Sequence, residues 1–389
     1  MFPAEIFDII GDFLFNDQQA LLACSLCRPL LPSARYHLFS VIHVQLRTKH
    51  IIALTNILRS TCNTISRYAR RVVFDDLANC LLIAGVSDIE RAIRKLPLLL
   101  SMLPFAEFVR ISNTNFEHVP QEVLRCLVSY LKPFVNLELH SLHFYRFSEF
   151  ADLVCSFPRL QQIDIKRLTW THSGRGITHL GRVPPHVEWH ILELRHGENL
   201  RELAEWLGEH NPTPIIRSFY FDAASQSEVY KLRSLVRRIA PSLRYLQISF
   251  PVSVDIHVAS EDPSLDFIDL QECTALRSLR YKHILLVPND HTMTTMINPW
   301  VSQILSQLPS DSLEDVGFEL TIPESSNETC LKEIDWSGIS SALLKKEFRY
   351  LRSIQFSMSA GKTFQCGHAA RYILDRMPSF KHALRVQMV

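Results

Sequence analysis

Glycine is scarce in this chain, with 11 residues among 389. Rossmann-type and P-loop sites depend on glycine-rich loops that let the backbone approach a phosphate. The nearest match to such a loop is Gly361-Lys362-Thr363, but Phe356 stands where the motif needs its first glycine. The sequence therefore predicts no nucleotide and no other cofactor.

An excess of charge of either sign is also missing. Lys and Arg number 41 and Asp and Glu number 40, so the net charge is +1. A nucleic-acid-binding protein needs a concentrated basic stripe, and a local group such as Arg67, Arg70 and Arg71 is more typical of a solvated face. We expect no nucleic-acid partner.

Neither a basic leader nor a long apolar run is present. The first residues carry Glu5, Asp8 and Asp12, which is unlike a secretory signal. The longest uncharged apolar stretch, 77–86, is too short to span a bilayer. These absences predict a soluble protein of the cytoplasm, the nucleus or both, without a membrane partner.

The nine cysteines are odd in number and scattered. Cys126, Cys155 and Cys273 lie in apolar runs, which favours buried thiols in a reducing compartment. Cys24 and Cys27 have metal-ligand spacing, but a structural zinc site needs four ligands and no second pair stands nearby. Helix packing is the better interpretation of that pair.

Histidines suggest no chemistry either. His140, His143 and His172 crowd the end of one repeat described below, and we interpret them as a surface cluster rather than a metal site. Cys366 and His368 are close in sequence, but a cysteine nucleophile needs a base within hydrogen-bond reach and an orienting third group. We predict no metal site, no catalytic residue and no enzyme activity.

The N-terminal stretch 2–39 has the pattern of short amphipathic helices. Pro3 and Glu5 are typical of a helix start. Apolar residues then recur at helical spacing, and Asn16-Asp17 can cap a second helix over 18–26. A third segment follows over 32–39. The apolar residues of the first helix are Ile6, Ile9, Ile10, Phe13 and Leu14.

This stretch resembles an F-box, in the variant common in large fungal families. The resemblance implies docking onto a Skp-type adaptor and, through it, onto a cullin–RING ubiquitin ligase. The family usually has Trp in the third segment, where this chain has Leu30. The matching residues are Phe2-Pro3-x-Glu5-Ile6, Ile9-Ile10, Leu14, Asp17, Ala23-Cys24-Ser25-Leu26, Arg28, Leu31-Pro32, Arg35 and His37-Leu38-Phe39. The residues expected to form the module core and its adaptor face are Phe2, Pro3, Ile6, Ile9, Ile10, Leu14, Leu26, Leu30 and Leu31.

Downstream, a short apolar pattern recurs through the chain. It has the form of a leucine-rich-repeat strand, although the spacing of the copies is irregular. Helix-compatible stretches precede several copies and stop at Pro158, Pro241 or Pro309, as a helix followed by a turn would. The copies are Phe134-x-x-Leu137-x-Leu139, Leu160-x-x-Ile163-x-Ile165, Val187-x-x-His190-x-Leu192, Ile216-x-x-Phe219-x-Phe221, Leu243-x-x-Leu246-x-Ile248, Leu276-x-x-Leu279-x-Tyr281, Leu313-x-x-Val316-x-Phe318 and Leu351-x-x-Ile354-x-Phe356.

These patterns predict an α/β protein. Residues 1–45 would form a small helical F-box-like module, and residues 46–389 an irregular leucine-rich-repeat-like solenoid with a curved parallel sheet. Polar insertions at 171–186, 254–264 and 322–338 are predicted loops. Tyr145 and Tyr220 are the candidate contacts to a target protein, because aromatic side chains anchor protein interfaces.

Two functions remain open at this stage. In one, the chain is the substrate-recognition subunit of an SCF-type ubiquitin ligase, with the F-box on the adaptor and the solenoid on the target. In the other, it is a non-catalytic scaffold whose N-terminal helices pack on the solenoid without recruiting a ligase. The absent Trp at Leu30 motivates the second.

Overall fold

The computed structural model describes most of the chain, and it divides into two compact units, Met1–Val187 and Glu188–Val389. The domain boundary predicted at residue 45 stays a prediction. The described residues are 4–14, 17–61, 63–172, 181, 186–195, 200–209, 214–222, 233, 235–249, 270–285, 299–309, 311–322, 331–332, 334–360 and 366–388.

The first unit begins with the three predicted helices, α1 (Ala4–Phe13), α2 (Gln18–Cys24) and α3 (Leu31–Phe39). Asp17 caps α2 as expected, since its Oδ1 accepts a hydrogen bond from the Ala20 amide at 2.9 Å. Behind α3, the Ser40 carbonyl accepts hydrogen bonds from the amides of Arg70 and Arg71, both at 2.9 Å. These bonds tie the end of the helical segment to the strand that starts at Arg71.

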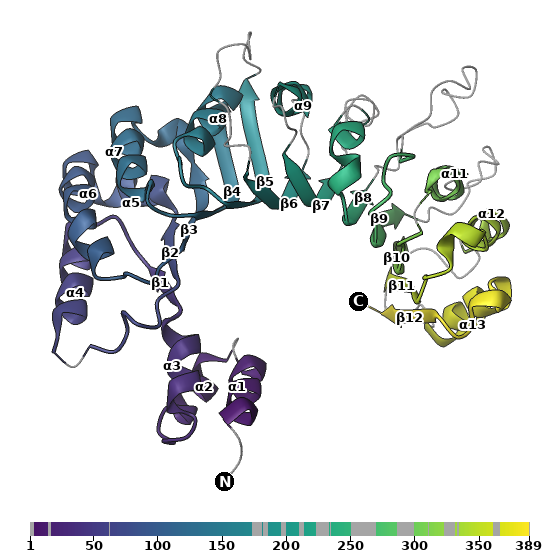
Figure 1. Ribbon diagram of the computed structural model, residues 1–389, viewed down its shortest axis with the longest axis horizontal. Helices are drawn as coiled ribbons and strands as arrows, with labels where there is room; N and C mark the ends of the chain where they lie inside the picture. The colour runs from purple at the N-terminus through teal and green to yellow at the C-terminus, as the bar shows by residue number, and fades with distance from the viewer. Residues whose placement is uncertain are drawn as a thin grey trace. The chain divides into compact units, whose positions relative to one another are not determined.

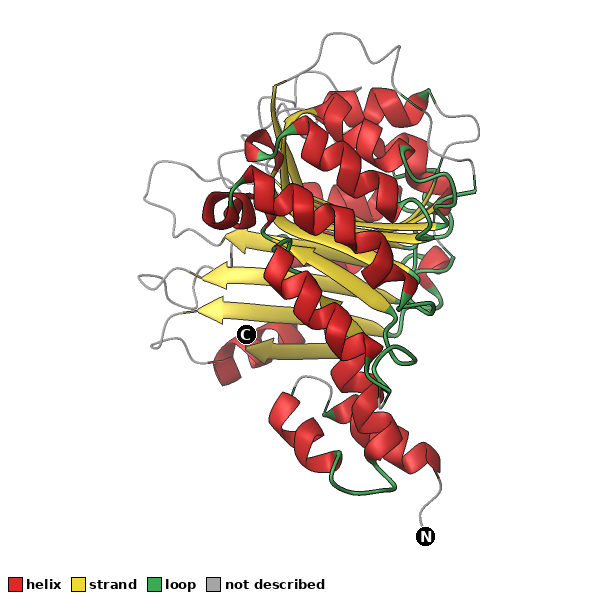
Figure 2. Ribbon diagram, turned by 90° about the vertical axis from the view of Figure 1, so that its left-hand side faces the viewer, coloured by secondary structure: helices red, strands yellow, loops and turns green. Residues whose placement is uncertain are grey.

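The rest of the first unit alternates strands and helices. Each strand pairs in parallel with the next one along the chain. The helices α4, α6, α7 and α8 form a layer on one face of these strands (Figures 1 and 2). The strands are β1 (Val41–His43), β2 (Arg71–Asp75), β3 (Phe108–Asn115), β4 (Asn136–Arg146) and β5 (Gln162–His172), and the helices are α4 (Thr48–Arg59), α5 (Leu77–Ala84), α6 (Val86–Ser101), α7 (Gln121–Leu131) and α8 (Phe147–Cys155), with a short 3₁₀ turn η1 (Phe116–His118).

The second unit repeats this order. Its strands are also parallel and neighbour one another in chain sequence. They are β6 (Glu188–Arg195), β7 (Ile215–Asp222), β8 (Tyr245–Ser249), β9 (Ser278–Leu285), β10 (Asp315–Ile322), β11 (Ser353–Ala360) and β12 (Leu384–Met388). Its helical segments are α9 (Leu200–Gly208), η2 (Ala240–Ser242), α11 (Pro299–Gln307), α12 (Trp336–Leu343), η5 (Lys346–Phe348), α13 (Cys366–Arg376) and η6 (Pro378–Phe380).

The repeat pattern marks the core of both units. In the copies centred on β4 and β5, the last two apolar positions are 1% exposed or less, as at Leu137 and Ile165. In the second unit, the rings of Tyr281, Phe318 and Phe356 stack on successive strands, with centroid distances of 5.3 and 4.7 Å. Full burial of such side chains stabilises the fold by roughly 1.5–3 kcal/mol each. The predicted α/β fold of stacked strand–helix repeats is confirmed.

Helix α6 continues through Pro97. Ile93, Leu96 and Leu99 bury one face of it, and this packing offsets the hydrogen bond that proline removes. The prediction of a buried thiol at Cys126 is wrong. Cys126 is exposed, because Leu124 and the other apolar residues of α7 point the opposite way.

The loop predictions fall partly outside the described residues. The insertion at 254–264 lies wholly outside them, and so do most of 171–186 and 323–330. The end of the third insertion is helical, since α12 begins at Trp336 with its N-cap Asp335 accepting a hydrogen bond from the Gly338 amide at 2.9 Å. The last strand, β12, was not predicted.

A column of β-bulges crosses the first unit. The strand register passes from the row Ser112–His140–Lys166 to the row Thr114–Leu142–Leu168 and skips Asn113, Ser141 and Arg167. These three residues have φ of 50°, 54° and 58°, the left-handed region that non-glycine residues rarely adopt. A β-bulge changes the side of the sheet to which the following side chains point. Because the bulge recurs at the same place in β3, β4 and β5, the residues after it still pair in register.

Candidate protein-binding surfaces

Helix α1 carries an exposed apolar stripe. Ile6, Ile9, Ile10 and Phe13 recur at helical spacing, so they share one side of the helix. Their exposed fractions are 39%, 61%, 38% and 90%. Large apolar side chains grouped on a surface mark a site of protein contact. We call these four residues the α1 stripe.

The interior of the three-helix segment combines one leucine with small residues. Leu21 and Ala34 are 1% exposed, and Gly11 is buried where α1 crosses α3. A Cβ at Gly11 would meet the side chains of Ser33 and His37, so a larger residue there would force a shift at this crossing. On the same crossing, His37 Nε2 lies 3.2 Å from Asp12 Oδ1.

The remaining predicted adaptor-face residues divide between core and surface. Leu14, Leu30 and Leu31 are half-buried, and Leu26 is 87% exposed. Phe2 and Pro3 lie outside the described residues. The prediction did not separate packing residues from surface residues, because both are apolar and occupy neighbouring helical positions.

A hollow of about 500 Å³ lies beside α2 and α3. Its walls are mostly apolar, with one guanidinium from Arg35. It adds to the apolar character of this end of the unit. Its lining includes Leu22, Leu31, Arg35, Leu38, Phe39 and Ile57.

The two predicted target contacts lie in different units. Tyr145, near the end of β4, is 39% exposed, and its ring meets that of His172 edge-on at 4.4 Å. Tyr220, on β7, is half-buried, and its ring lies 4.9 Å from that of Tyr245 on β8. Burial raises the pKa of Tyr220, and it raises the pKa of Tyr245 to about 12.

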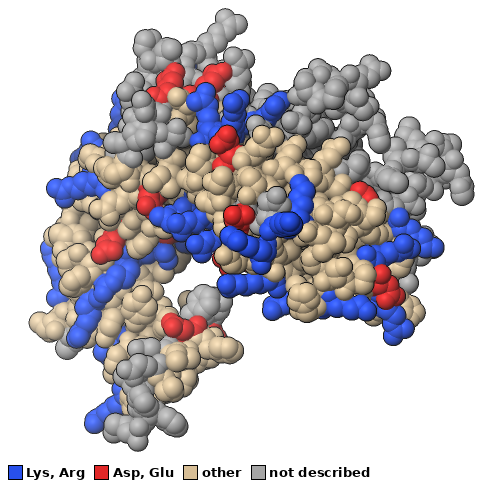
Figure 3. Space-filling model, turned by 45° about the vertical axis from the view of Figure 1, so that its right-hand side comes forward, with Lys and Arg blue, Asp and Glu red and all other residues tan. Residues whose placement is uncertain are grey.

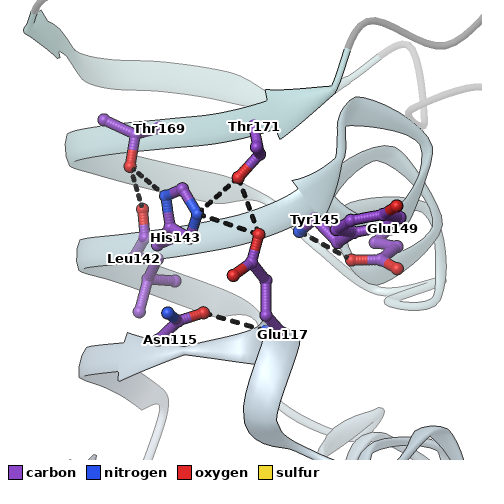
Figure 4. Close-up of polar contacts among 8 residues, drawn as sticks. All are labelled: Asn115, Glu117, Leu142, His143, Tyr145, Glu149, Thr169 and Thr171. Atoms are coloured by element: carbon purple, nitrogen blue, oxygen red, sulfur yellow. Dashed lines mark hydrogen bonds and ion pairs between the residues drawn. The ribbon is translucent and has the colours of Figure 1, made fainter.

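A polar network joins the carboxyl ends of β3, β4 and β5 near Tyr145 (Figure 4). His143 Nδ1 lies 2.8 Å from Thr169 Oγ1, and its Nε2 lies 2.9 Å from Thr171 Oγ1. Thr171 donates to Glu117 Oε1 at 2.6 Å. This hydrogen bond, aided by His143, lowers the pKa of Glu117. The polar atoms of this network bond to one another across the strands, which is typical of a structural role.

The predicted histidine cluster does not converge on a metal. His140 precedes the bulge and His143 follows it, and His143 is committed to two threonine hydroxyls. Burial, then Arg110 and Lys166, lower the pKa of His140 to about 4. Cations beside an imidazole oppose a bound metal ion. Within the described ranges, no group of three potential metal ligands was found.

The sheet face opposite the helices holds a buried carboxylate that the sequence did not reveal. Glu138 on β4 accepts a hydrogen bond from Arg110 Nε at 2.6 Å and pairs with Arg71 Nη2 at 2.8 Å. The Glu138 side chain is 6% exposed, whereas both arginines are about 30% exposed. The ion-pair cluster could have been predicted from the sequence only if the strand register had been known, because Arg71, Arg110 and Glu138 lie on three different strands.

Comparisons with known proteins add little. No protein-family model and no curated protein matches the sequence. Among solved structures, a leucine-rich-repeat protein of Leptospira interrogans is similar over 74% of this chain and 91% of its own, at 10% identity and a TM-score of 0.20.

None of the helices in the described ranges is long and apolar enough to cross a membrane.

Proposed function

We propose that this chain is the substrate-recognition subunit of an SCF-type ubiquitin ligase. Its N-terminal helices would dock onto a Skp-type adaptor, and through the adaptor onto a cullin, while the repeat units hold a target protein. The chain would make or break no bond itself. Its contribution would be proximity, because holding a target lysine near a charged ubiquitin carrier raises their effective concentration.

The observation that carries this proposal is the α1 stripe. Four large apolar side chains on one helix face are left to solvent, although the same helix buries Gly11 against α3. The stripe coincides with the residues that resemble the F-box motif at Ile6 and Ile9-Ile10. A helix with an apolar face suits a groove on a partner protein.

Co-purification with a Skp-type adaptor tests the proposal. The double variant Ile9→Asp with Phe13→Asp places two charges on the most exposed part of the stripe. Substitutions there should change the free energy of unfolding little. We expect the parent chain to be retained by the adaptor and this variant to be lost.

A matched control makes the result specific. Leu82 and Ile83 on α5 are 84% and 60% exposed, close to the values for Phe13 and Ile9. The variant Leu82→Asp with Ile83→Asp should bind the adaptor as the parent does. If the parent chain itself is not retained at micromolar concentration, the non-catalytic scaffold is the better assignment.

A further inference from the structure

Four arginines and one glutamate occupy one row near the amino-terminal ends of β7 to β11. The Arg244 amide donates to the Arg217 carbonyl, and the Arg277 amide donates to the Arg244 carbonyl, both at 2.8 Å. In the same way, the Glu314 amide donates to the Arg277 carbonyl at 2.8 Å, and the Arg352 amide donates to the Glu314 carbonyl at 2.7 Å. We call these five residues the arginine row.

The arginine row has more positive charge than its carboxylates neutralise. Glu314 lies 3.8 Å from Arg277 and 3.7 Å from Arg352, and these arginines are 60% and 75% exposed. Exposed pairs of this kind contribute only about 0–1 kcal/mol, so they leave the guanidiniums available to a partner. Arg244 is exposed, and no carboxylate of the described residues forms an ion pair with it.

A second cationic group stands further along the same strands, with Arg280 of β9 three residues after Arg277. The Arg280 guanidinium lies 5.9 Å from the centre of the Tyr245 ring, which in turn contacts Tyr220. Gly317 pairs with Arg280 on the next strand, and a Cβ there would lie 3.1 Å from the Arg280 Cγ. The missing side chain leaves room for the Arg280 side chain beside β10. Tyrosine and arginine are the residue types that dominate binding hot spots.

The geometry sets the length and charge of a fitting partner. Neighbouring strands lie about 4.8 Å apart, so five strands span roughly 19 Å, which an extended peptide covers with about six residues. Figure 3 views a face on which Lys and Arg side chains are numerous, with Asp and Glu side chains interspersed among them. Carboxylates are the groups that guanidiniums bind in bidentate fashion.

We propose that the arginine row, together with Tyr220, Tyr245 and Arg280, binds an extended acidic segment of the target protein. A peptide suits the row better than a nucleic acid, because Glu314 and the Arg217 partner Glu188 interrupt the positive charge. A peptide can place an uncharged residue opposite a carboxylate, whereas a phosphate backbone cannot. This inference rests on the proposed target-binding role of the repeats, and it does not depend on the adaptor.

Fluorescence anisotropy with the full-length chain tests it. The probe is a fluorescein-labelled octapeptide of Glu and Asp, compared with a Ser/Gln octapeptide and with an oligouridine of the same length. We expect saturable binding of the acidic peptide, weakened by added salt, and weaker binding of the other two. The variant Arg277→Glu with Arg352→Glu should bind the acidic peptide at least ten-fold more weakly.

Two further variants isolate the cause. Arg94→Glu with Arg125→Glu makes the same charge change at exposed helical positions of the first unit and should leave binding unchanged. Gly317→Val keeps every charge but fills the space that Arg280 crosses, and it should weaken binding several-fold. Equal binding by the Arg277/Arg352 variant, tighter binding of oligouridine, or no binding of the acidic peptide would each overturn the inference.

Adaptor capture by the same proteins separates the two proposals. Failure of the parent chain to bind the acidic peptide, although it still captures the adaptor, would refute the acidic-segment inference alone. Peptide binding without adaptor capture would refute the ligase assignment and leave the arginine row standing.

Discussion

Arg110 on β3 donates from its Nε to Glu138 on β4 across 2.6 Å, and the carboxylate is 6% exposed. Arg71 Nη2 on β2 lies 2.8 Å from Oε1 of the same carboxylate, so side chains of three consecutive strands form one ion-pair cluster. The two guanidiniums remain partly solvated, whereas Glu138 has little access to water. Removal of the Glu138 carboxylate should therefore lower the free energy of unfolding more than removal of either guanidinium.

Glu138→Gln should lower the free energy of unfolding by about 2–3 kcal/mol, because it leaves two like charges beside a neutral amide. Urea unfolding followed by circular dichroism measures the change. Glu90→Gln is the control: Glu90 is 48% exposed and pairs with Arg94 at 3.9 Å, so its loss should cost less than about 0.5 kcal/mol. Equal effects of the two variants would contradict the role given to Glu138.

The crossing of α1 and α3 depends on the absence of a side chain at Gly11. Gly11→Ala should loosen this crossing, at a cost of about 1–3 kcal/mol, since the new methyl group would meet Ser33 and His37. Amide hydrogen exchange in residues 4–39 reports this locally. Gly367→Ala, in α13 where nothing lies within 4 Å of the added Cβ, should be neutral or slightly stabilising. Unchanged exchange in the Gly11 variant would show that α1 does not pack as described.

His140 gives the stability of the chain a dependence on pH. Burial, with Arg110 and Lys166 ahead of the opposing Glu138 and then Arg71, lowers its pKa from 6.5 to about 4. Below pH 6.5 the unfolded chain takes up a proton that the folded chain refuses until about pH 4, so the free energy of unfolding falls across this interval. Because the ring is partly exposed, we expect a loss of roughly 1 kcal/mol between about pH 7 and about pH 5.

The substitution His140→Gln should remove this part of the pH dependence. Urea unfolding at both pH values measures it, and His118→Gln, at an exposed histidine after β3, is the control. A pH dependence that is identical in the parent chain and the His140 variant would refute the assignment.

Thiol labelling should follow the exposure of each cysteine. Cys27 and Cys126 are exposed and should react with maleimide in the native protein, whereas Cys80 and Cys273 are buried and should react only after unfolding. Burial raises the pKa of Cys155 to about 12, so this thiol should also react slowly near pH 8. Peptide mapping by mass spectrometry distinguishes these sites. Rapid native labelling of Cys273 would contradict its place in the core.

Patterns within single segments were enough to predict most of the elements. The spacing of Ile6, Ile9 and Ile10 predicted α1, and each Leu-x-x-Leu-x-Leu copy after residue 134 became a strand. The prediction failed where the side of a helix decides burial. Cys126 faces water although its neighbours in sequence are apolar.

The sequence by itself determined the repeating alternation of helix and strand, because the periodicity of apolar residues requires one buried face in each element. Only the tertiary structure decided which side chains meet across strands. Glu138 reaches Arg71 and Arg110, and Arg277 reaches Glu314, through a register that backbone hydrogen bonds set between segments roughly 30 residues or more apart. No periodicity within one segment encodes that register, so the polar surfaces proposed to bind a target become visible only in the folded chain.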